Sequence, residues 1–243
     1  MSLFILGVFL VLMFLGIPVA VSLGMASLGA ILMYDTSTIA SAVKLMYSSM
    51  NSFTMVAVPL FFLAGILMDK GGVAEQIFSF CEDVVGWIHG GLGHVNIMTS
   101  ILFAGMSGSS VADVASIGAL CANAMIRSGY PSPYAWGTTL ASSMLASVIP
   151  PSILMVVAAS VAQVSMGQAL FAGIIPGVFL GLVMMVYNYF YCKKHGIGHR
   201  IPFNGGRLWK SFKRALPALM VPVILLGGMY TGYFPSAEAA AIC

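Results

Sequence analysis

Residues 105–113 read Gly-Met-Ser-Gly-Ser-Ser-Val-Ala-Asp, a glycine and serine break that carries one carboxylate inside a long uncharged stretch. No charged residue lies between Asp83 and Asp113, and the next one follows only at Arg127. In hydrocarbon an irregular backbone leaves polar groups unpaired at several kcal/mol each, so it is tolerated only where it lines a cavity or binds a ligand. The carboxylate of Asp113 is costly there as well, which makes it a functional candidate by default.

The composition is that of a membrane protein. Of the 243 residues, 60% are hydrophobic and 7% are charged, whereas a soluble domain carries about 25% charged residues. Seven of the ten basic residues lie between Lys193 and Arg214, and such a cluster marks a cytoplasmic loop rather than a nucleic-acid patch. The four scattered cysteines form no CxxC pair, so we expect them to be packing residues rather than disulfides or metal ligands.

Long apolar segments predict an all-α polytopic fold, because a span needs about 20 apolar residues. Residues 128–192 carry no charge and suffice for two spans. The expected spans are 53–68, which is short, 134–158, 168–192 and 215–237. Residues 3–34 are interrupted at Gly16-Ile17-Pro18 and form either one kinked helix or two short ones.

Two further segments are expected outside the bilayer core. Apolar residues recur at helical spacing over 75–89, opposite a polar face, which predicts a helix lying along the membrane interface. Segment 35–52 is polar and is expected to be an external link. Residues 238–243 resemble the opening of another apolar helix, so the chain is expected to be a fragment or the first part of a longer protein.

Residues 95–126 are too long for one ordinary span and too short for two. A re-entrant hairpin that enters and leaves on the cytoplasmic side, with its tip at the Gly105–Ser110 break, fits this length best. A single span stays open, because the acidic residues that precede the segment orient it only weakly.

The tip offers the oxygen ligands that hard cations prefer. Ser107, Ser109 and Ser110 carry hydroxyls, and the backbone carbonyls around Gly105 and Gly108 are freed by the break. Broken helices in transporters supply carbonyls to Na⁺ in this way. The alternative is that small residues merely allow close helix packing.

Asp113 lies about one turn beyond the serines on the return arm of this hairpin. It can orient the tip, ligate an ion, carry a proton or serve as a structural cap, and the sequence leaves these roles open.

A second break follows at Ser147-Val148-Ile149-Pro150-Pro151-Ser152. The two prolines remove two N–H donors and disfavour helical geometry at Ile149, so the 134–158 helix must break and free carbonyls near it. A simple kink without a ligand is the alternative. Because two breaks lie in neighbouring segments, and because Ser147 and Ser152 flank the second one, we expect one shared ion site between them.

Other chemistries are disfavoured. His89 and His94 lie in a glycine-rich loop without further ligands, which argues against a transition-metal site. The chain has neither a phosphate-binding GxxxxGK[ST] loop nor a GxSxG elbow, so an ATP-driven pump and a serine hydrolase are disfavoured. We expect no enzyme activity and no organic cofactor.

The sequence resembles the large membrane subunit (M subunit) of tripartite ATP-independent periplasmic (TRAP) transporters, of C4-dicarboxylate or sialic-acid type. The matching stretches are 103–118 (FAGMSGSSVADVASIG), 58–65 (VPLFFLAG), 149–152 (IPPS) and 227–239 (GGMYTGYFPSAEA). The resemblance covers essentially the whole chain, although members of that family have about twice as many spans.

The resemblance implies an ion-transporter-superfamily fold with two inverted repeats and an elevator-type transport domain. Residues 1–94 would be scaffold-like, 95–192 transport-domain-like, 193–214 a basic cytoplasmic loop, and 215–243 the start of the second repeat. The implied sodium site consists of Gly105, Ser107, Gly108, Ser109, Ser110, Ile149, Pro150 and Ser152, supported by Asp113, Ser147 and Pro151.

The implied activity is Na⁺-coupled import of small organic carboxylates across the bacterial inner membrane by a multi-pass protein. A small four-helix membrane subunit and a periplasmic substrate-binding protein would be its partners. The alternatives are a standalone carboxylate/Na⁺ symporter of the same superfamily, a passive channel, or a membrane-embedded enzyme or scaffold that uses Asp113.

Overall fold

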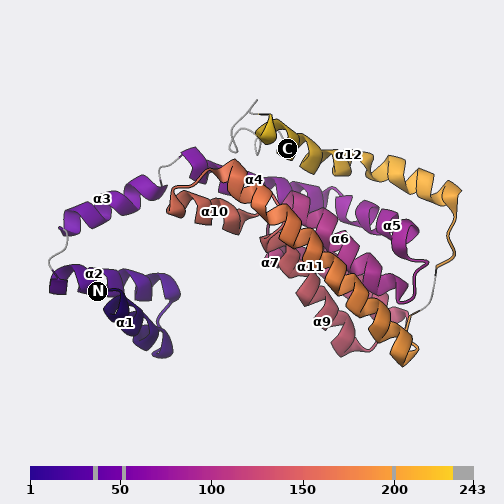
Figure 1. The fold of residues 1–243 in the computed structure, drawn as a ribbon, viewed down its shortest axis with the longest axis horizontal. Coiled ribbons are helices and arrows are strands. Elements are labelled where there is room, and N and C mark those ends of the chain that lie inside the picture. Colours follow the sequence, from indigo (N-terminus) through magenta and orange to yellow (C-terminus); the bar gives the residue numbers. More distant parts are fainter. Residues whose placement is uncertain (35–37, 51–52, 199–200, 232–243) are drawn as a thin grey trace. The chain divides into compact units, whose positions relative to one another are not determined.

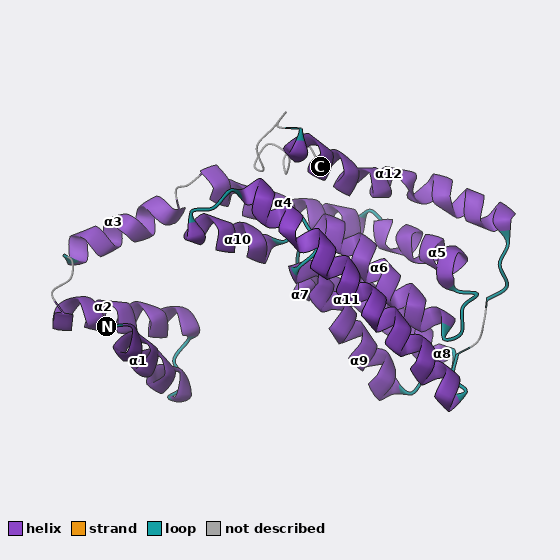
Figure 2. Ribbon diagram, viewed as in Figure 1, coloured by secondary structure: helices purple, strands orange, loops and turns teal. Residues whose placement is uncertain are grey.

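The computed structural model describes residues 1–34, 38–50, 53–198 and 201–231, and this part of the chain contains helices and loops without a strand (Figures 1 and 2). By length and composition alone, two of its helical segments are long and apolar enough to cross a bilayer: Met166–His195 and Gly205–Gly228. The expected helix start at 238–243 lies outside the described residues. An all-helical, strongly apolar chain is consistent with a polytopic membrane protein.

Residues Met1–Ser52 form one compact unit. It contains α1 (Ser2–Phe14), α2 (Val19–Tyr34) and α3 (Ile39–Met50). Gly16 has φ +82°, a left-handed conformation that glycine adopts without strain, and Pro18 follows where α2 begins. Helices α1 and α2 pack against each other, so the two-helix alternative for 3–34 holds.

Residues from Phe53 onward form the second compact unit. Its successive elements are α4 (Phe53–Lys70), α5 (Val73–Val85), α6 (Gly91–Ser107), α7 (Ser110–Asp113), a π-helical turn η1 (Val114–Gly118), α8 (Ala119–Arg127), α9 (Ser132–Ser143), a 3₁₀ turn η2 (Met144–Ser147), α10 (Ile153–Ala162), α11 (Met166–His195) and α12 (Gly205–Tyr230).

The stretch 95–126 forms a helical hairpin. Helix α6 ends at the tip, the chain turns at Gly108, and the return arm η1–α8 packs back against α6. Ile117, Cys121 and Met125 of this arm are fully buried or nearly so, together with Val95 and Phe103 of α6. Its depth in a membrane, and hence its re-entrant character, stays a prediction.

Helix α5 is part of this core. Ile77 and Cys81 have no exposed surface, and α5 packs against α6 and α12. Its apolar face therefore contacts protein, and its position along the membrane interface stays a prediction. The compact units divide after Ser52, and the expected division into scaffold-like and transport-domain-like parts after residue 94 stays a prediction.

The second break is present as expected. The helix predicted over 134–158 is divided into α9, the turn η2 and α10, with Pro150 and Pro151 between η2 and α10. The next helix, α11, presents buried glycines to this region. Gly173 faces the carbonyl of Val148, and Gly177 faces the side chain of Ile149.

Helix α12 begins at Gly205, so the segment 193–214 is not a loop throughout. Arg207, Lys210, Lys213 and Arg214 lie on the first turns of α12, and the connection from α11 is the shorter segment after His195. The helix forms because Asn204 accepts bonds from the N–H groups of Gly206 and Arg207 at 3.0 and 3.3 Å, which caps its first turn. The cytoplasmic position of this segment stays a prediction.

The buried glycine face of α11 should resist even one methyl group. A Cβ at Gly173 would overlap the Val148 carbonyl and lie 2.7 Å from the Met155 methyl carbon. We expect Gly173→Ala to lower the free energy of unfolding by about 1–3 kcal/mol through overpacking. Thermal unfolding of the full-length protein in detergent measures this.

Gly137→Ala is the matched control, because Gly137 lies inside α9 with open space around it. It should be neutral or stabilising by about 0.5–1 kcal/mol, since alanine favours the helix over glycine. Equal melting temperatures for the two variants would contradict the packing of α11 described above.

Candidate functional site

The hairpin tip is a short non-helical turn between two helix ends. Gly108 has φ +59° and ends α6, with its N–H donating to the Ala104 carbonyl. Ser109 is extended and caps α7, because its hydroxyl accepts a bond from the N–H of Ala112 at 3.3 Å. The glycine and serine residues of this stretch therefore end one helix, α6, and begin the next, α7, within three residues.

At the second break a serine also caps the helix that follows. Ser152 is extended and caps α10, since its hydroxyl accepts from the Met155 N–H at 3.3 Å. The same hydroxyl donates to the Ser147 carbonyl at 2.7 Å. Pro150 and Pro151 are buried and lie directly before this cap.

The two breaks meet. The N–H of Ile153, at the start of α10, donates to the carbonyl oxygen of Gly108 at 3.1 Å. The hydroxyl of Ser147 donates to that of Ser110 at 3.2 Å. A Cβ at Gly108 would clash with the Pro151 carbonyl, so glycine is required both for φ and for this close approach. We call this contact of tip and break the junction.

The junction is rich in oxygen atoms that retain bonding capacity. Within the described part of the chain, the carbonyl oxygens of Ile149 and Pro150 accept no hydrogen bond. Each serine oxygen has two lone pairs, and the hydroxyls of Ser109 and Ser152 each use one for capping. Both segments thus contribute carbonyl and hydroxyl oxygens near the junction, the ligand type that a hard cation prefers.

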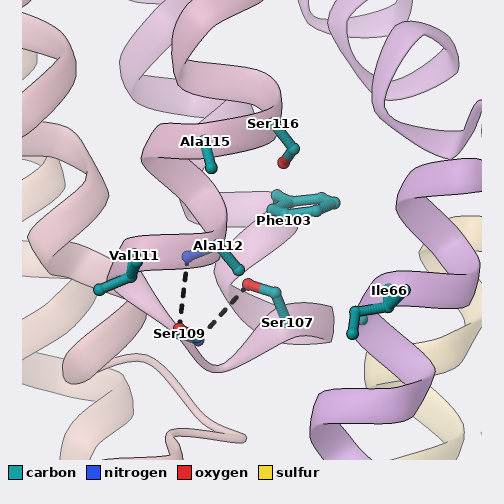
Figure 3. A pocket seen from close by; sticks show the side chains of 9 residues that line it. Ile66, Phe103, Ser107, Ser109, Val111, Ala112, Ala115 and Ser116 are labelled. Carbon is teal, nitrogen blue, oxygen red and sulfur yellow. Dashed lines mark hydrogen bonds between the residues drawn. The ribbon is translucent and has the colours of Figure 1, made fainter.

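A pocket of about 320 Å³ opens beside the tip. Figure 3 shows Ser107 and Ser109 at one end of it and Phe103 and Ser116 at the other, with Ile66 of α4 across the space. The remaining lining residues are small or aliphatic: Gly65, Val111, Ala112 and Ala115. The pocket thus combines an apolar wall with a few hydroxyls, and its described lining carries no charged side chain.

Asp113 lies one turn beyond the tip and is fully buried. Neither carboxylate oxygen has a hydrogen-bond partner among the described residues, although the hydroxyls of Ser100 and Ser143 lie beside it. The π-helical turn starts directly after it, and such turns in α-helices are frequent at functional sites. A buried carboxylate without a partner is costly, so its position here calls for a functional explanation.

A buried polar network next to Asp113 was not predicted. Asn96 donates to Thr139 at 2.7 Å, and the hydroxyls of Ser100 and Ser142 are 3.1 Å apart. These residues join α6 to α9 and are fully buried. Their four-residue spacing in α6 and three-residue spacing in α9, within helices that carry no charged residue, is the sequence signal that indicates a shared polar face.

All the predicted site residues therefore lie at the junction or within about a turn of it. Gly105 packs on Pro222 of α12 and lies near the Pro150 carbonyl, and Ser107 is buried at the end of α6. His89 and His94 contact each other through the His89 carbonyl and take no part in the junction. Ion binding by the junction stays a prediction.

Two helices that break and face each other in an all-α, strongly apolar chain are a feature of secondary transporters, whose ion and substrate sites are formed by such breaks. The family description "Tripartite ATP-independent periplasmic transporter, DctM component" matches residues 6–243. The chain belongs to this family, which confirms the resemblance seen in the sequence.

Curated relatives of this chain are also TRAP transporter permeases. The chain is 40% identical over 231 residues to the sialic acid TRAP transporter large permease protein SiaM of Vibrio cholerae, covering 95% of this chain and 54% of SiaM. It is 38% identical to the sialic acid TRAP transporter permease protein SiaT of Haemophilus influenzae, covering 97% of this chain and 38% of SiaT.

It is also 35% identical to the C4-dicarboxylate TRAP transporter large permease protein DctM of Vibrio cholerae, covering 95% of this chain and 51% of DctM. The chain thus spans about half the length or less of these relatives. All three are named permeases, in agreement with a transporter rather than an enzyme.

The junction should not tolerate a side chain at Gly108. Gly108→Ala adds both left-handed strain and a clash with the Pro151 carbonyl, which separates the two breaks. We expect substrate uptake by the full-length protein to fall at least about tenfold, which corresponds to about 1.4 kcal/mol. Uptake into proteoliposomes measures it.

Gly129→Ala controls for strain alone, because Gly129 has φ +88° with open space around it. Its cost is that of an alanine in the left-handed region, about 1–2 kcal/mol of stability, and uptake should be retained. An equal loss of uptake in both variants would refute a specific requirement at the junction.

Proposed function

We propose that this chain is part of the membrane subunit of a sodium-coupled importer of small organic carboxylates. Membership of the DctM family supports this, as do relatives named for sialic acid and C4-dicarboxylate transport. The observation that carries the proposal is the junction, where the carbonyl of Gly108 accepts the first N–H of α10. There one ion can contact two separate segments at once.

Sodium is the ion that this oxygen set suits. The ligands we propose are carbonyl oxygens of the tip and of Ile149 and Pro150, with hydroxyls of Ser109, Ser110 and Ser152. All are neutral, and a monovalent hard cation needs no full negative charge to be bound by carbonyls and hydroxyls. Asp113 acts from one turn away, where its negative charge favours a cation nearby.

The pocket beside the tip supports binding of a small anion. Its hydroxyls, Ser107, Ser109 and Ser116, can donate hydrogen bonds to a carboxylate, and its apolar wall excludes water. Because the described lining carries no cationic side chain, a bound Na⁺ supplies the positive charge that the anion needs. Substrate affinity then depends on sodium, which is a coupling free energy between two adjacent sites.

Coupled movement follows from the same contact. Na⁺ holds the tip and the second break together, and the loaded pair then slides as one body against the rest of the subunit, in an elevator-type mechanism. The full protein, in the bacterial inner membrane with several spans, works with a small four-helix membrane subunit and receives its substrate from a periplasmic binding protein.

Uptake of radiolabelled succinate and sialic acid tests the proposal. Proteoliposomes hold the full-length protein and its small membrane partner, with or without an inward Na⁺ gradient and with or without the soluble binding protein. Uptake that requires both supports the sodium-coupled tripartite function. Uptake that requires neither the gradient nor the soluble protein overturns it in favour of a standalone carrier or a channel.

Removing two hydroxyls at the junction should weaken sodium binding. We expect Ser109→Ala with Ser110→Ala to raise the Na⁺ concentration for half-maximal uptake about tenfold, since each lost hydrogen-bonding oxygen costs about 0.5–1.5 kcal/mol. Ser110→Ala alone leaves the α7 cap intact and should show part of the shift. Ser132→Ala, at an exposed serine of α9, is the control, and an unchanged sodium curve in the double variant would exclude these ligands.

A further inference from the structure

A polar groove lies between α5 and α12, on the chain's most basic segment. From α12 it is lined by residues at the spacing of one helix face, Arg207, Lys210, Ser211 and Arg214. From α5 it is lined by Gln76, Ser79 and Asp83. The two helices pack side by side (Figure 1), so the groove is built by the fold and does not depend on a loop.

The groove carries surplus positive charge. Arg207 is engaged, because it forms ion pairs with Glu82 at 2.9 Å and Asp83 at 2.6 Å. Lys210 and Arg214 form no ion pair with any described residue. These two cations therefore face the groove without a counter-ion, beside hydroxyls that can donate hydrogen bonds.

One acceptor in the groove also lacks a partner. Asp83 is 7% exposed, and its Oδ2 accepts no hydrogen bond from the described residues. A ligand that satisfies the groove thus needs an anionic group for Lys210 and Arg214 and a hydrogen-bond donor for Asp83. The volume of about 190 Å³ equals roughly six water molecules at ~30 Å³ each, which is room for a head group and not for an acyl chain.

Aromatic side chains near the groove are of the kind expected at a membrane surface. Trp209 is 60% exposed, stacks on Phe212 at a centroid distance of 6.0 Å, and has the Lys213 ammonium 5.2 Å from its ring centroid. Trp87, just beyond α5, is 51% exposed. Exposed tryptophans beside lysines and arginines are typical of the head-group layer.

We propose that this groove binds the phosphate group of an anionic phospholipid. Lys210 and Arg214 hold the phosphate, the hydroxyls of Ser79 and Ser211 donate to it, and a hydroxyl of the head group donates to Asp83. Basic pockets between helices of membrane proteins recognise lipid phosphates on the same physical grounds. Phosphatidylglycerol has both the charge and the hydroxyls, whereas the quaternary ammonium of phosphatidylcholine has no hydrogen to donate. This inference does not depend on the proposed transport function.

Native mass spectrometry of the full-length protein, titrated with phosphatidylglycerol or phosphatidylcholine in detergent, tests the inference. Phosphatidylglycerol should bind the wild type more tightly, and K210Q/R214Q should weaken its binding about 30-fold, at about 1 kcal/mol for each cation near a charged surface. K210Q alone should show about a fivefold loss by the same arithmetic. Both side chains are exposed, so the variants should fold, and unchanged melting temperatures would verify this.

K193Q/K194Q is the matched control, because it removes two adjacent exposed cations from the last turn of α11. It should change phosphatidylglycerol binding less than twofold, a shift below about 0.4 kcal/mol. Equal losses in both double variants would show surface attraction without a site and would overturn the proposal. Undiminished binding by K210Q/R214Q would do the same. Inorganic phosphate that displaces phosphatidylglycerol at equal concentration would identify free phosphate as the occupant and refute the lipid assignment.

Discussion

The hydrogen bond from the Ile153 N–H to the Gly108 carbonyl is the contact on which the rest of this structure depends. Each helix that breaks in an apolar environment leaves polar backbone groups that water cannot satisfy. Here one orphan acceptor, at the end of α6, meets one orphan donor, at the start of α10. Each break thereby stabilises the other, and the oxygens left over around them become available for a ligand.

Local chemistry explains why much of the site could be predicted. Glycine and serine at 105–110 indicate a turn followed by a cap, and the adjacent prolines at 150 and 151 forbid a continuous helix. Both signals depend on a few neighbouring residues and not on contacts with distant segments. The signal for α11 is equally local, because an uncharged apolar run of this length is typical of a membrane-spanning helix.

Other features could not be predicted because they arise between distant segments. Asn96 and Thr139, which form a hydrogen bond, are 43 positions apart. The pattern of one helix does not predict which polar face of another helix it contacts. The apolar face of α5 follows from periodicity, but its contact with protein, where Ile77 is fully buried, does not, since periodicity identifies an apolar face and not its neighbour. The charge of 205–214 indicated a loop, whereas its capping residue Asn204 starts a helix.

The glycine face of α11 has a mechanical consequence. Because Gly173 and Gly177 carry no side chains, the backbone of α11 lies directly against the Val148 carbonyl and the Ile149 side chain, and α11 cannot shift past the second break without overlap of atoms. The thirty-residue helix α11 is thus held, near its start, against the second break. A displacement of the second break would therefore move the contacting part of α11 with it, and Pro176, inside the helix, is where α11 could bend before its basic end at Lys193 and Lys194.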